Sequence, residues 1–422
     1  MHPTSRSIRG EVIAVAVVLA VATLAFWTTR LDLAAADAFR VPCCSWPMAE
    51  RPFWSFIYRY GIFAGILLAA AALVAFTLSY WLPRQLFAWR RPALFLVLVA
   101  ALGPGLLVNG IFKDHYGRPR PREVQELGGQ ERFLPVWVRG TDPQAKSFPC
   151  GHCSMGFYLS VPWLVLRRRR RALAAAFLGA GFAAGGVLGV ARMMAGGHFF
   201  SDVLWAGGMV WIVALVLHRL LDPERVVEPA ERDHAADRSR ARLVTLVSSG
   251  LLAALTVGAL LATPYFSRKT FTRKAADVRA SAASVWEVSL DEATVAVEAG
   301  PDLEASYEVR AFGFPNSRLN FAFAERPDAA VLSIDRIGWF TERRTNVALR
   351  LPAAGEKPVH LRLGKGRLAL DLRGFSPSAR LDVEVGEGEV RVTGADALAR
   401  GNVRVTVARG RVIDAVAPSA HP

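Results

Sequence analysis

The chain has 422 residues, of which 52% are hydrophobic, and it carries a formal net charge of +15. Together with a positive mean hydropathy, this composition excludes an ordinary soluble globular protein. A basic excess can indicate nucleic-acid binding. Here the arginines gather between apolar runs, as in membrane proteins, so we expect no nucleic-acid partner.

Seven apolar runs are each close to the ~20 residues with which an α-helix crosses a bilayer. They cover residues 11–28, 61–82, 92–112, 151–166, 172–191, 199–217 and 243–262. No small-residue cleavage site follows Phe26-Trp27, so the first run is interpreted as a retained helix rather than a signal peptide. The sequence predicts an all-α bundle of six spanning helices and a seventh spanning helix after it.

Arginine accumulates on alternate sides of these runs. It occurs before the first run, between the second and third, and as five consecutive residues, Arg167 to Arg171, between the fourth and fifth. Because short cytoplasmic loops retain Lys and Arg, we expect a multi-pass protein of the bacterial inner membrane with a cytoplasmic N-terminus. Segments 113–121, 149–152 and 192–202 then lie at the periplasmic face.

A lysine and an arginine follow the third run. Lys113 is separated by six residues from Arg120, and Pro119 and Pro121 hold the backbone around Arg120 extended. Alone, such cations at a helix end would be interpreted as anchors that reach toward lipid headgroups. Arginine also suits two-point binding of phosphate oxygens and lysine adds a compact charge, so the pair is a candidate phosphate clamp.

The segment Pro149-Cys150-Gly151-His152 begins the fourth run. Unpaired backbone N–H groups and the helix dipole favour an anion at a helix start, and Gly151 allows a phosphate to come close. His152 can protonate a departing alkoxide as a general acid. An isolated histidine near a membrane surface usually has no chemical role, but this one is accompanied by other candidate residues.

A second histidine and an aspartate begin the sixth run. His198 and Asp202 are four residues apart and share one helix face. An aspartate that accepts from one imidazole nitrogen leaves the other nitrogen free to attack phosphorus, so His198 is a candidate nucleophile that would form a phosphohistidine. Arg192, at the end of the fifth run, would complete the cationic cradle.

With these residues the chain resembles the type 2 phosphatidic acid phosphatase (PAP2) superfamily over residues 11–217. That family's pattern is lysine, six residues, Arg-Pro; then Pro-Ser-Gly-His; then Ser-Arg, five residues, histidine, three residues, aspartate. The resemblance implies a six-helix membrane lipid phosphatase that uses neither a metal nor a cofactor. It implies phosphate binding by Lys113, Arg120, Cys150, Gly151 and Arg192, and catalysis by His152, His198 and Asp202.

Two positions depart from the family pattern: Cys150 and Ala191 each stand where the family has serine. A thiol is a weaker hydrogen-bond donor than a hydroxyl, so one contact to phosphate would be weakened. We also expect that a Cys150–Cys153 disulfide can form, distort this helix start and make the enzyme sensitive to oxidation.

Two other functions remain open. Cys150 and Cys153 form a Cys-x-x-Cys motif and, with Cys43 and Cys44, would suit a membrane thiol-disulfide oxidoreductase. However, the thioredoxin motif follows a strand, whereas this motif opens an apolar helix. The third possibility is a non-catalytic lipid-binding relative.

A site level with the headgroups favours a phosphate on a membrane lipid as the substrate. Relatives with outward-facing sites suggest lipid A or undecaprenyl pyrophosphate among the candidates. The loop 113–146 is basic and would suit a headgroup with several phosphates, which slightly favours lipid A. Its basic residues include Arg118, Arg122, Arg132, Arg139 and Lys146. The alternative is that this loop lies against anionic lipid.

Short alternating segments follow residue 262 and predict an all-β domain. Leu363-Gly364-Lys365-Gly366 recurs 22 residues later as Val385-Gly386-Glu387-Gly388 and, less closely, again at 407–410. Such a period suggests a solenoid resembling adhesin-like domains, on the periplasmic side, with an unknown partner. The predicted domains are 1–217 (phosphatase bundle), 218–242 (charged cytoplasmic linker), 243–262 (seventh spanning helix) and 263–422 (β-rich repeat).

Overall fold

The computed structural model divides the chain into two compact units, Met1–Thr256 and Val257–Pro422, each described here by itself. It describes residues 4–41, 46–47, 51–82, 86–129, 131–142, 145–224, 234–261, 263–280, 283–325, 329–353, 357–394 and 402–415. Cys43 and Cys44 lie outside these residues.

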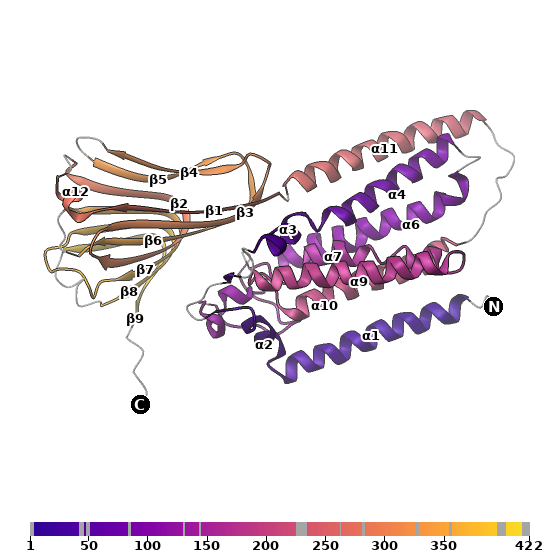
Figure 1. The fold of residues 1–422 in the computed structure, drawn as a ribbon, viewed down its shortest axis with the longest axis horizontal. Helices are drawn as coiled ribbons and strands as arrows, with labels where there is room; N and C mark the ends of the chain where they lie inside the picture. The colour runs from indigo at the N-terminus through magenta and orange to yellow at the C-terminus, as the bar shows by residue number, and fades with distance from the viewer. Residues whose placement is uncertain are drawn as a thin grey trace. The chain divides into compact units, whose positions relative to one another are not determined.

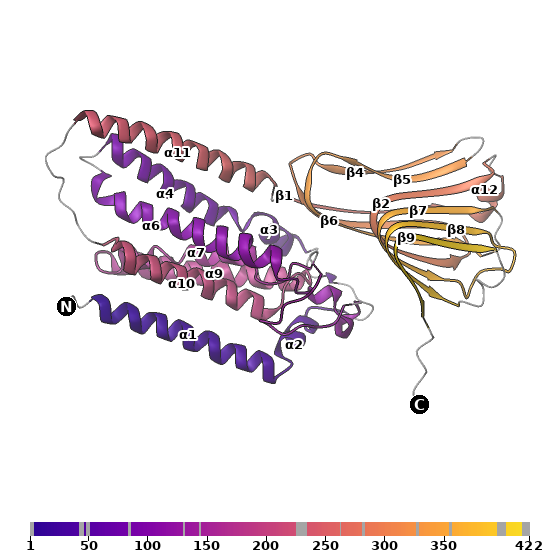
Figure 2. The same ribbon diagram turned by 180° about the vertical axis from the view of Figure 1, so that it is seen from behind.

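The first unit is helical (Figures 1 and 2). Its helices are α1 (Thr4–Thr28), α2 (Leu31–Asp37), α3 (Pro52–Tyr60), α4 (Phe63–Trp81), η2 (Phe87–Trp89), α6 (Arg90–Ala100), η3 (Ala101–Lys113), η4 (Pro121–Glu123), η5 (Gln125–Leu127), α7 (Gly151–Tyr158), α8 (Trp163–Leu166), α9 (Arg171–Met194), α10 (Phe200–Leu221) and α11 (His234–Leu261). η3 continues α6 as a π-helix that contains Pro104, a residue that has no backbone N–H to donate.

Six helical segments are long and apolar enough to cross a membrane. They are Gly10–Thr28, Pro52–Trp81, Phe87–Lys113, Arg171–Met194, Phe200–Leu221 and Arg238–Leu261. The chain is therefore a multi-pass membrane protein. Six of the seven predicted runs correspond to these segments, whereas 151–166 does not qualify because a turn before Trp163 divides it into α7 and α8.

The divided segment nevertheless extends along the whole of α10. At its start, the Cys150 N–H donates to the Asp202 carbonyl at the beginning of α10. At its end, the Leu164 carbonyl lies 3.1 Å from His218 Nε2 in the last turns of α10. Arg167 then forms an ion pair with Glu11, near the start of α1, with 2.6 Å between Nη1 and Oε1. Residues 150–167 thus connect the two ends of the helical unit.

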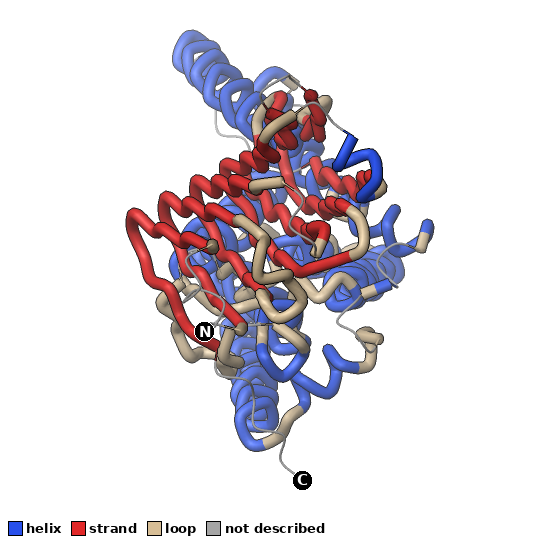
Figure 3. Tube along the Cα trace, turned by 90° about the vertical axis from the view of Figure 1, so that its left-hand side faces the viewer, coloured by secondary structure: helices blue, strands red, loops and turns tan. Residues whose placement is uncertain are grey.

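The second unit is a nine-stranded mixed sheet in which β1-β3-β6-β2-β7-β8-β9 are neighbours, and β5 pairs with β2 and β4 (Figure 3). Its strands are β1 (Thr263–Arg273), β2 (Val285–Gly300), β3 (Leu303–Gly313), β4 (Arg318–Glu325), β5 (Ala329–Ile337), β6 (Phe340–Pro352), β7 (Val359–Asp371), β8 (Leu381–Thr393) and β9 (Val403–Ala415), with one short helix, α12 (Ala275–Ala280). Pairs β1–β3, β3–β6 and β4–β5 are antiparallel, which the repeat did not predict.

The predicted 22-residue repeat is confirmed in the parallel part of this sheet. Leu363 pairs with Val385, and Val385 pairs with Val407, so equivalent repeat positions are adjacent on β7, β8 and β9. A glycine recurs in each strand because neighbouring backbones approach closely there: Gly388 has φ +151°, and a Cβ atom on it would overlap the carbonyl oxygen of Gly366. The alternating Leu and Val side chains form one buried core.

Candidate active site

The three predicted motif segments meet at one end of the helical unit. The Ser147 N–H donates to the Arg118 carbonyl at 3.0 Å, which joins the loop after η3 to the segment before α7. The Cys150 N–H donates to the Asp202 carbonyl at 3.2 Å, which joins that segment to α10. These backbone bonds bring residues distant in the sequence into one site.

His198 is completely buried immediately before α10. Its Nδ1 lies 2.5 Å from the Ser147 carbonyl oxygen, and since a carbonyl only accepts, Nδ1 carries the proton. Nε2 is therefore the nitrogen with the free lone pair, and it is buried without a hydrogen-bond partner among the described residues. A buried nitrogen left in this state is available to a ligand.

Asp202 is a more distant partner of His198 than the sequence predicts. The distance from its Oδ2 to His198 Nδ1 is 3.8 Å, beyond hydrogen-bond length. Oδ2 instead accepts from the Ser147 hydroxyl at 2.6 Å and from the Phe199 N–H at 2.8 Å. Asp202 thus fixes Ser147, whose carbonyl orients His198, and closes the first turn of α10.

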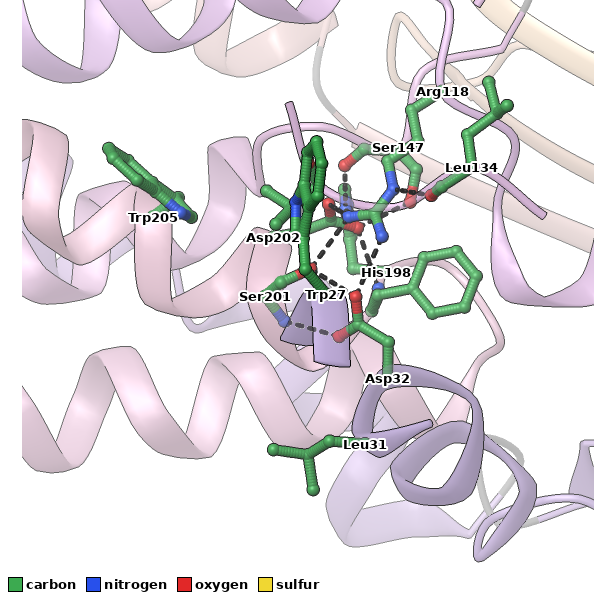
Figure 4. A network of polar contacts seen from close by, with 12 residues as sticks. Trp27, Leu31, Asp32, Arg118, Leu134, Ser147, His198, Ser201, Asp202 and Trp205 are labelled. Atoms are coloured by element: carbon green, nitrogen blue, oxygen red, sulfur yellow. Dashed lines mark hydrogen bonds and ion pairs between the residues drawn. The ribbon is translucent and has the colours of Figure 1, made fainter. Parts of the chain in front are cut away.

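Arg118 links this site to the N-terminal region, which sequence reasoning did not predict. Its guanidinium donates to Asp202 Oδ1, to Asp32 Oδ2 at 2.8 Å and to the Ser201 hydroxyl at 2.8 Å (Figure 4). Arg118 is 0% and Asp32 2% exposed. Burial acts to lower the pKa of Arg118, but Asp202 and Asp32 together raise it above its ordinary value. One cation is therefore held between two buried carboxylates.

This network corrects one interpretation of the basic loop 113–146. Arg118 is among the residues predicted to hold a phosphorylated headgroup, but its guanidinium is used by the buried carboxylates. Lys146 forms an ion pair with Asp114, 2.9 Å from Nζ to Oδ1. Arg132 and Arg139 remain exposed. The only hint of the Arg118 contact in the sequence is an aspartate, Asp32, soon after the first apolar run.

The predicted cations gather around the two histidines. Arg120 and Arg192 are almost fully buried and Lys113 is partly buried. The charges of Arg192, Lys113, His198 and Arg120 all act on His152. Burial is the main cause that lowers the pKa of His198 to about 4, which Arg192 lowers further and Asp202 opposes. These neighbours place all five residues in one electrostatic cluster.

Tyr58, on α3, is a further residue that the motifs did not identify. The Arg192 guanidinium carbon lies 4.3 Å from the centroid of the Tyr58 ring. The same ring lies 6.1 Å, between centroids, from the His152 imidazole. A cation held over an aromatic face is oriented by the ring quadrupole, so Tyr58 helps to position Arg192 beside His152.

Cys150 and Cys153 form the predicted disulfide. Helix α7 still begins at Gly151, with Cys150 as the N-cap and its sulfur accepting from the Cys153 N–H, so the expected distortion of the helix start is not seen. A Cβ atom on Gly151 would overlap Asn109 Oδ1, so the Asn109 side chain would have to move. The Cys153 N–H at this helix start is used by the Cys150 sulfur and not left for an anion.

Replacing both cysteines by serine is expected to leave kcat within about threefold of wild type, because backbone groups and cations, not the sulfur, hold the anion. Phosphate release by wild type and by the double variant is measured in reductant and in oxidant, and the disulfide is followed by the mass of the protein. Wild-type activity that falls on oxidation, while the double variant's activity stays constant, would instead confirm the predicted sensitivity to oxidation.

The structure gives little support to thiol exchange at this motif. Both cysteines are 0% exposed, whereas redox-active cysteines are accessible to a partner thiol. A loop precedes the motif and a helix begins within it, whereas a thioredoxin motif follows a strand. The second pair, Cys43 and Cys44, lies outside the described residues.

Comparisons with known proteins agree with the motif. Residues 93–225, which include every predicted site residue, match a family model described as the PAP2 superfamily. The chain is 36% identical over 170 residues to a lipid A 4'-phosphatase from Francisella tularensis subsp. novicida, covering 40% of this chain and 76% of that protein. It is 34% identical over 119 residues to a lipid A 4'-phosphatase from Rhizobium leguminosarum, covering 27% and 49%. Among solved structures, a PAP2-type phosphatidylglycerolphosphate phosphatase from Bacillus subtilis is similar with a TM-score of 0.35 and 18% identity, covering 51% and 98%.

Proposed function

We propose that this chain, which belongs to the PAP2 superfamily of membrane lipid phosphatases, removes a phosphate group from lipid A through a phosphohistidine on His198. The chemistry rests on one observation above all: the buried His198 Nε2 has no partner among the described residues and lies in a cluster of cations. The substrate rests on the similarity to lipid A 4'-phosphatases.

In the first step, the His198 Nε2 lone pair attacks phosphorus and the P–O bond to the lipid breaks. Arg120, Arg192 and Lys113 neutralise the phosphoryl oxygens as charge moves onto them. The Nδ1–H stays with the Ser147 carbonyl, 2.5 Å away, which stabilises the positive charge that develops on the ring. In the second step, water attacks phosphorus, the P–N bond breaks and inorganic phosphate leaves.

His152 protonates the departing lipid oxygen and later accepts a proton from the attacking water. Burial and then the charges of Arg192 and Lys113 favour its neutral form in the free enzyme. A bound phosphate adds negative charge to the same cluster and so favours the protonated imidazole. Substrate binding thereby supplies the acid form that the first step needs.

Because the pKa of His198 is about 4, its nucleophilic neutral form is lost only in strong acid. We expect kcat/KM not to be reduced by protonation of His198 near neutral pH. Below about pH 4 it should fall tenfold per pH unit, as the imidazole becomes protonated. A 31P NMR titration of the lipid alone gives the substrate's own ionisation, which is divided out. A corrected midpoint near 6.5 would contradict this description of His198.

We further propose a cytoplasmic N-terminus and a periplasmic active site in the bacterial inner membrane. The path of residues 150–167 along α10, together with the six candidate spans, gives seven crossings. The run Arg167 to Arg171 then lies with the start of α1 on the cytoplasmic side. The β unit follows the seventh crossing into the periplasm, where its repeats β7–β9 would form stacked coils with a binding or scaffolding role.

A panel of lipid phosphates tests the substrate. Purified protein is given lipid A, phosphatidic acid, phosphatidylglycerol phosphate and undecaprenyl pyrophosphate, and inorganic phosphate is measured for wild type and for Cys150→Ser/Cys153→Ser. We expect the highest kcat/KM with lipid A. Faster release from undecaprenyl pyrophosphate would show that this lipid, and not lipid A, is the preferred substrate. No release from any lipid would favour a non-catalytic relative.

A further inference from the structure

Exposed apolar side chains gather on one part of the β unit. Trp339 is 72%, Ile337 43% and Phe314 38% exposed, and Phe266 on β1 is 40% exposed. These are four of the five large apolar side chains that are exposed in the described strands and loops after residue 262. We name Phe314, Ile337 and Trp339 the aromatic tip.

The aromatic tip is a fixed structure formed by two connections, one between β3 and β4 and the other between β5 and β6. The Phe314 N–H donates to the Trp339 carbonyl at 3.0 Å. Ser317 is buried between them, where its hydroxyl donates to the Trp339 carbonyl at 2.8 Å and accepts from the Trp339 N–H at 3.1 Å. Since both loops are bonded to each other, the exposure of Trp339 is built into the fold.

The tip lies at the end of the sheet that is tethered to the membrane. Helix α11, a candidate span, ends at Leu261, and Thr263 begins β1 two residues later. Thr263 pairs with Gly313, the residue before Phe314. At the other end of the same ladder Arg273 pairs with Leu303, about 33 Å away at ~3.3 Å per residue. The covalent connection to α11 is therefore made at the end of the sheet that carries the tip, and not at the opposite end.

The side chains at the tip suit the headgroup region of a bilayer. Tryptophan and other aromatic residues prefer that region because part of the ring is apolar and part is polar. Arg336, beside Ile337, and Arg318, which pairs with Ile337, are also exposed, and such cations are attracted to anionic lipids. A solvent-facing tip would leave these apolar groups in water with no compensating contact.

We propose that the aromatic tip inserts into the headgroup region of the leaflet from which α11 emerges and holds the β unit against the membrane. The partner is the lipid surface itself, with anionic headgroups beside Arg318 and Arg336. This docking is independent of phosphate transfer and does not require a particular lipid as substrate.

Photo-crosslinking of the full chain tests this proposal. The photoreactive residue p-benzoylphenylalanine is placed at Trp339, at Phe314 or, as a matched control, at exposed Pro301 in the turn at the opposite end of the sheet. Each protein is reconstituted in nanodiscs of phosphatidylethanolamine and phosphatidylglycerol and irradiated, and lipid adducts are measured by intact mass. Size-exclusion chromatography confirms that each variant is folded. Two tip positions are used so that the test still works if one of the two variants does not fold.

We expect lipid adducts at the two tip positions at least fivefold above the level at Pro301. Equal adduct levels at all three positions would overturn the proposal. Adducts between two copies of the chain, without lipid adducts, would show that the tip is a protein interface and would overturn it as well.

Discussion

Replacing His198 by alanine is expected to lower kcat by about 10⁴-fold or more, because no other described nitrogen in the site combines burial with a free lone pair. The substitution leaves Ser147, Asp202 and the cations in place, so KM should change far less than kcat. Phosphate release from lipid A in single-turnover and steady-state assays measures both constants.

His115→Ala is a matched control for the loss of a histidine near the site. His115 is exposed just after η3, where its Nδ1 lies 3.1 Å from the Ile111 carbonyl oxygen. Its removal should leave kcat within about twofold. A His198→Ala protein that keeps a tenth or more of wild-type kcat would exclude His198 as the nucleophile.

Replacing Arg118 by methionine is expected to lower the free energy of unfolding by about 3–5 kcal/mol, the cost of removing one partner from a buried ion pair. Asp32 and Asp202 would then share a buried region without their bridging cation. Activity should fall by more than 100-fold, since Asp202 fixes Ser147 and thereby the orientation of His198. Thermal unfolding in detergent and kcat measure the two effects.

Two further variants separate charge from size at this position. Arg118→Lys retains the charge but not the fork that reaches both carboxylates, so intermediate stability is expected. Adding Asp32→Asn to Arg118→Met removes one uncompensated carboxylate and should restore part of the lost stability. Exposed Arg132→Met controls for the loss of an arginine from the same loop. An unchanged unfolding temperature in Arg118→Met would show that the network does not stabilise the fold.

The sequence predicted the parts that depend on local spacing. Apolar length identified six candidate spans, and the four-residue spacing of His198 and Asp202 predicted that they lie close together at the start of α10. The sequence did not reveal the contact between Arg118 and Asp32, two residues that are 86 positions apart. Nothing in the local sequence distinguishes a buried arginine from an exposed one in a basic loop. For the same reason the role of the Ser147 carbonyl could be found only from the structure.

The β unit shows the same limit. A period of 22 residues predicted the parallel neighbours β7, β8 and β9, since residues at equivalent positions pair directly. Strands β1, β3 and β6 carry no such period, and their antiparallel pairing depends on contacts between distant segments. The division of 151–166 was likewise missed, although Pro162 in that run is a residue that ends helices.

The proposed covalent intermediate is tested most directly by rapid acid-free quenching of the protein with 32P-labelled lipid A. We predict label on wild-type protein within one turnover, stable to alkali and lost in acid, as expected of a phosphohistidine, and mapped by peptide analysis to His198. Label on another residue, or label that persists in His198→Ala, would contradict the account.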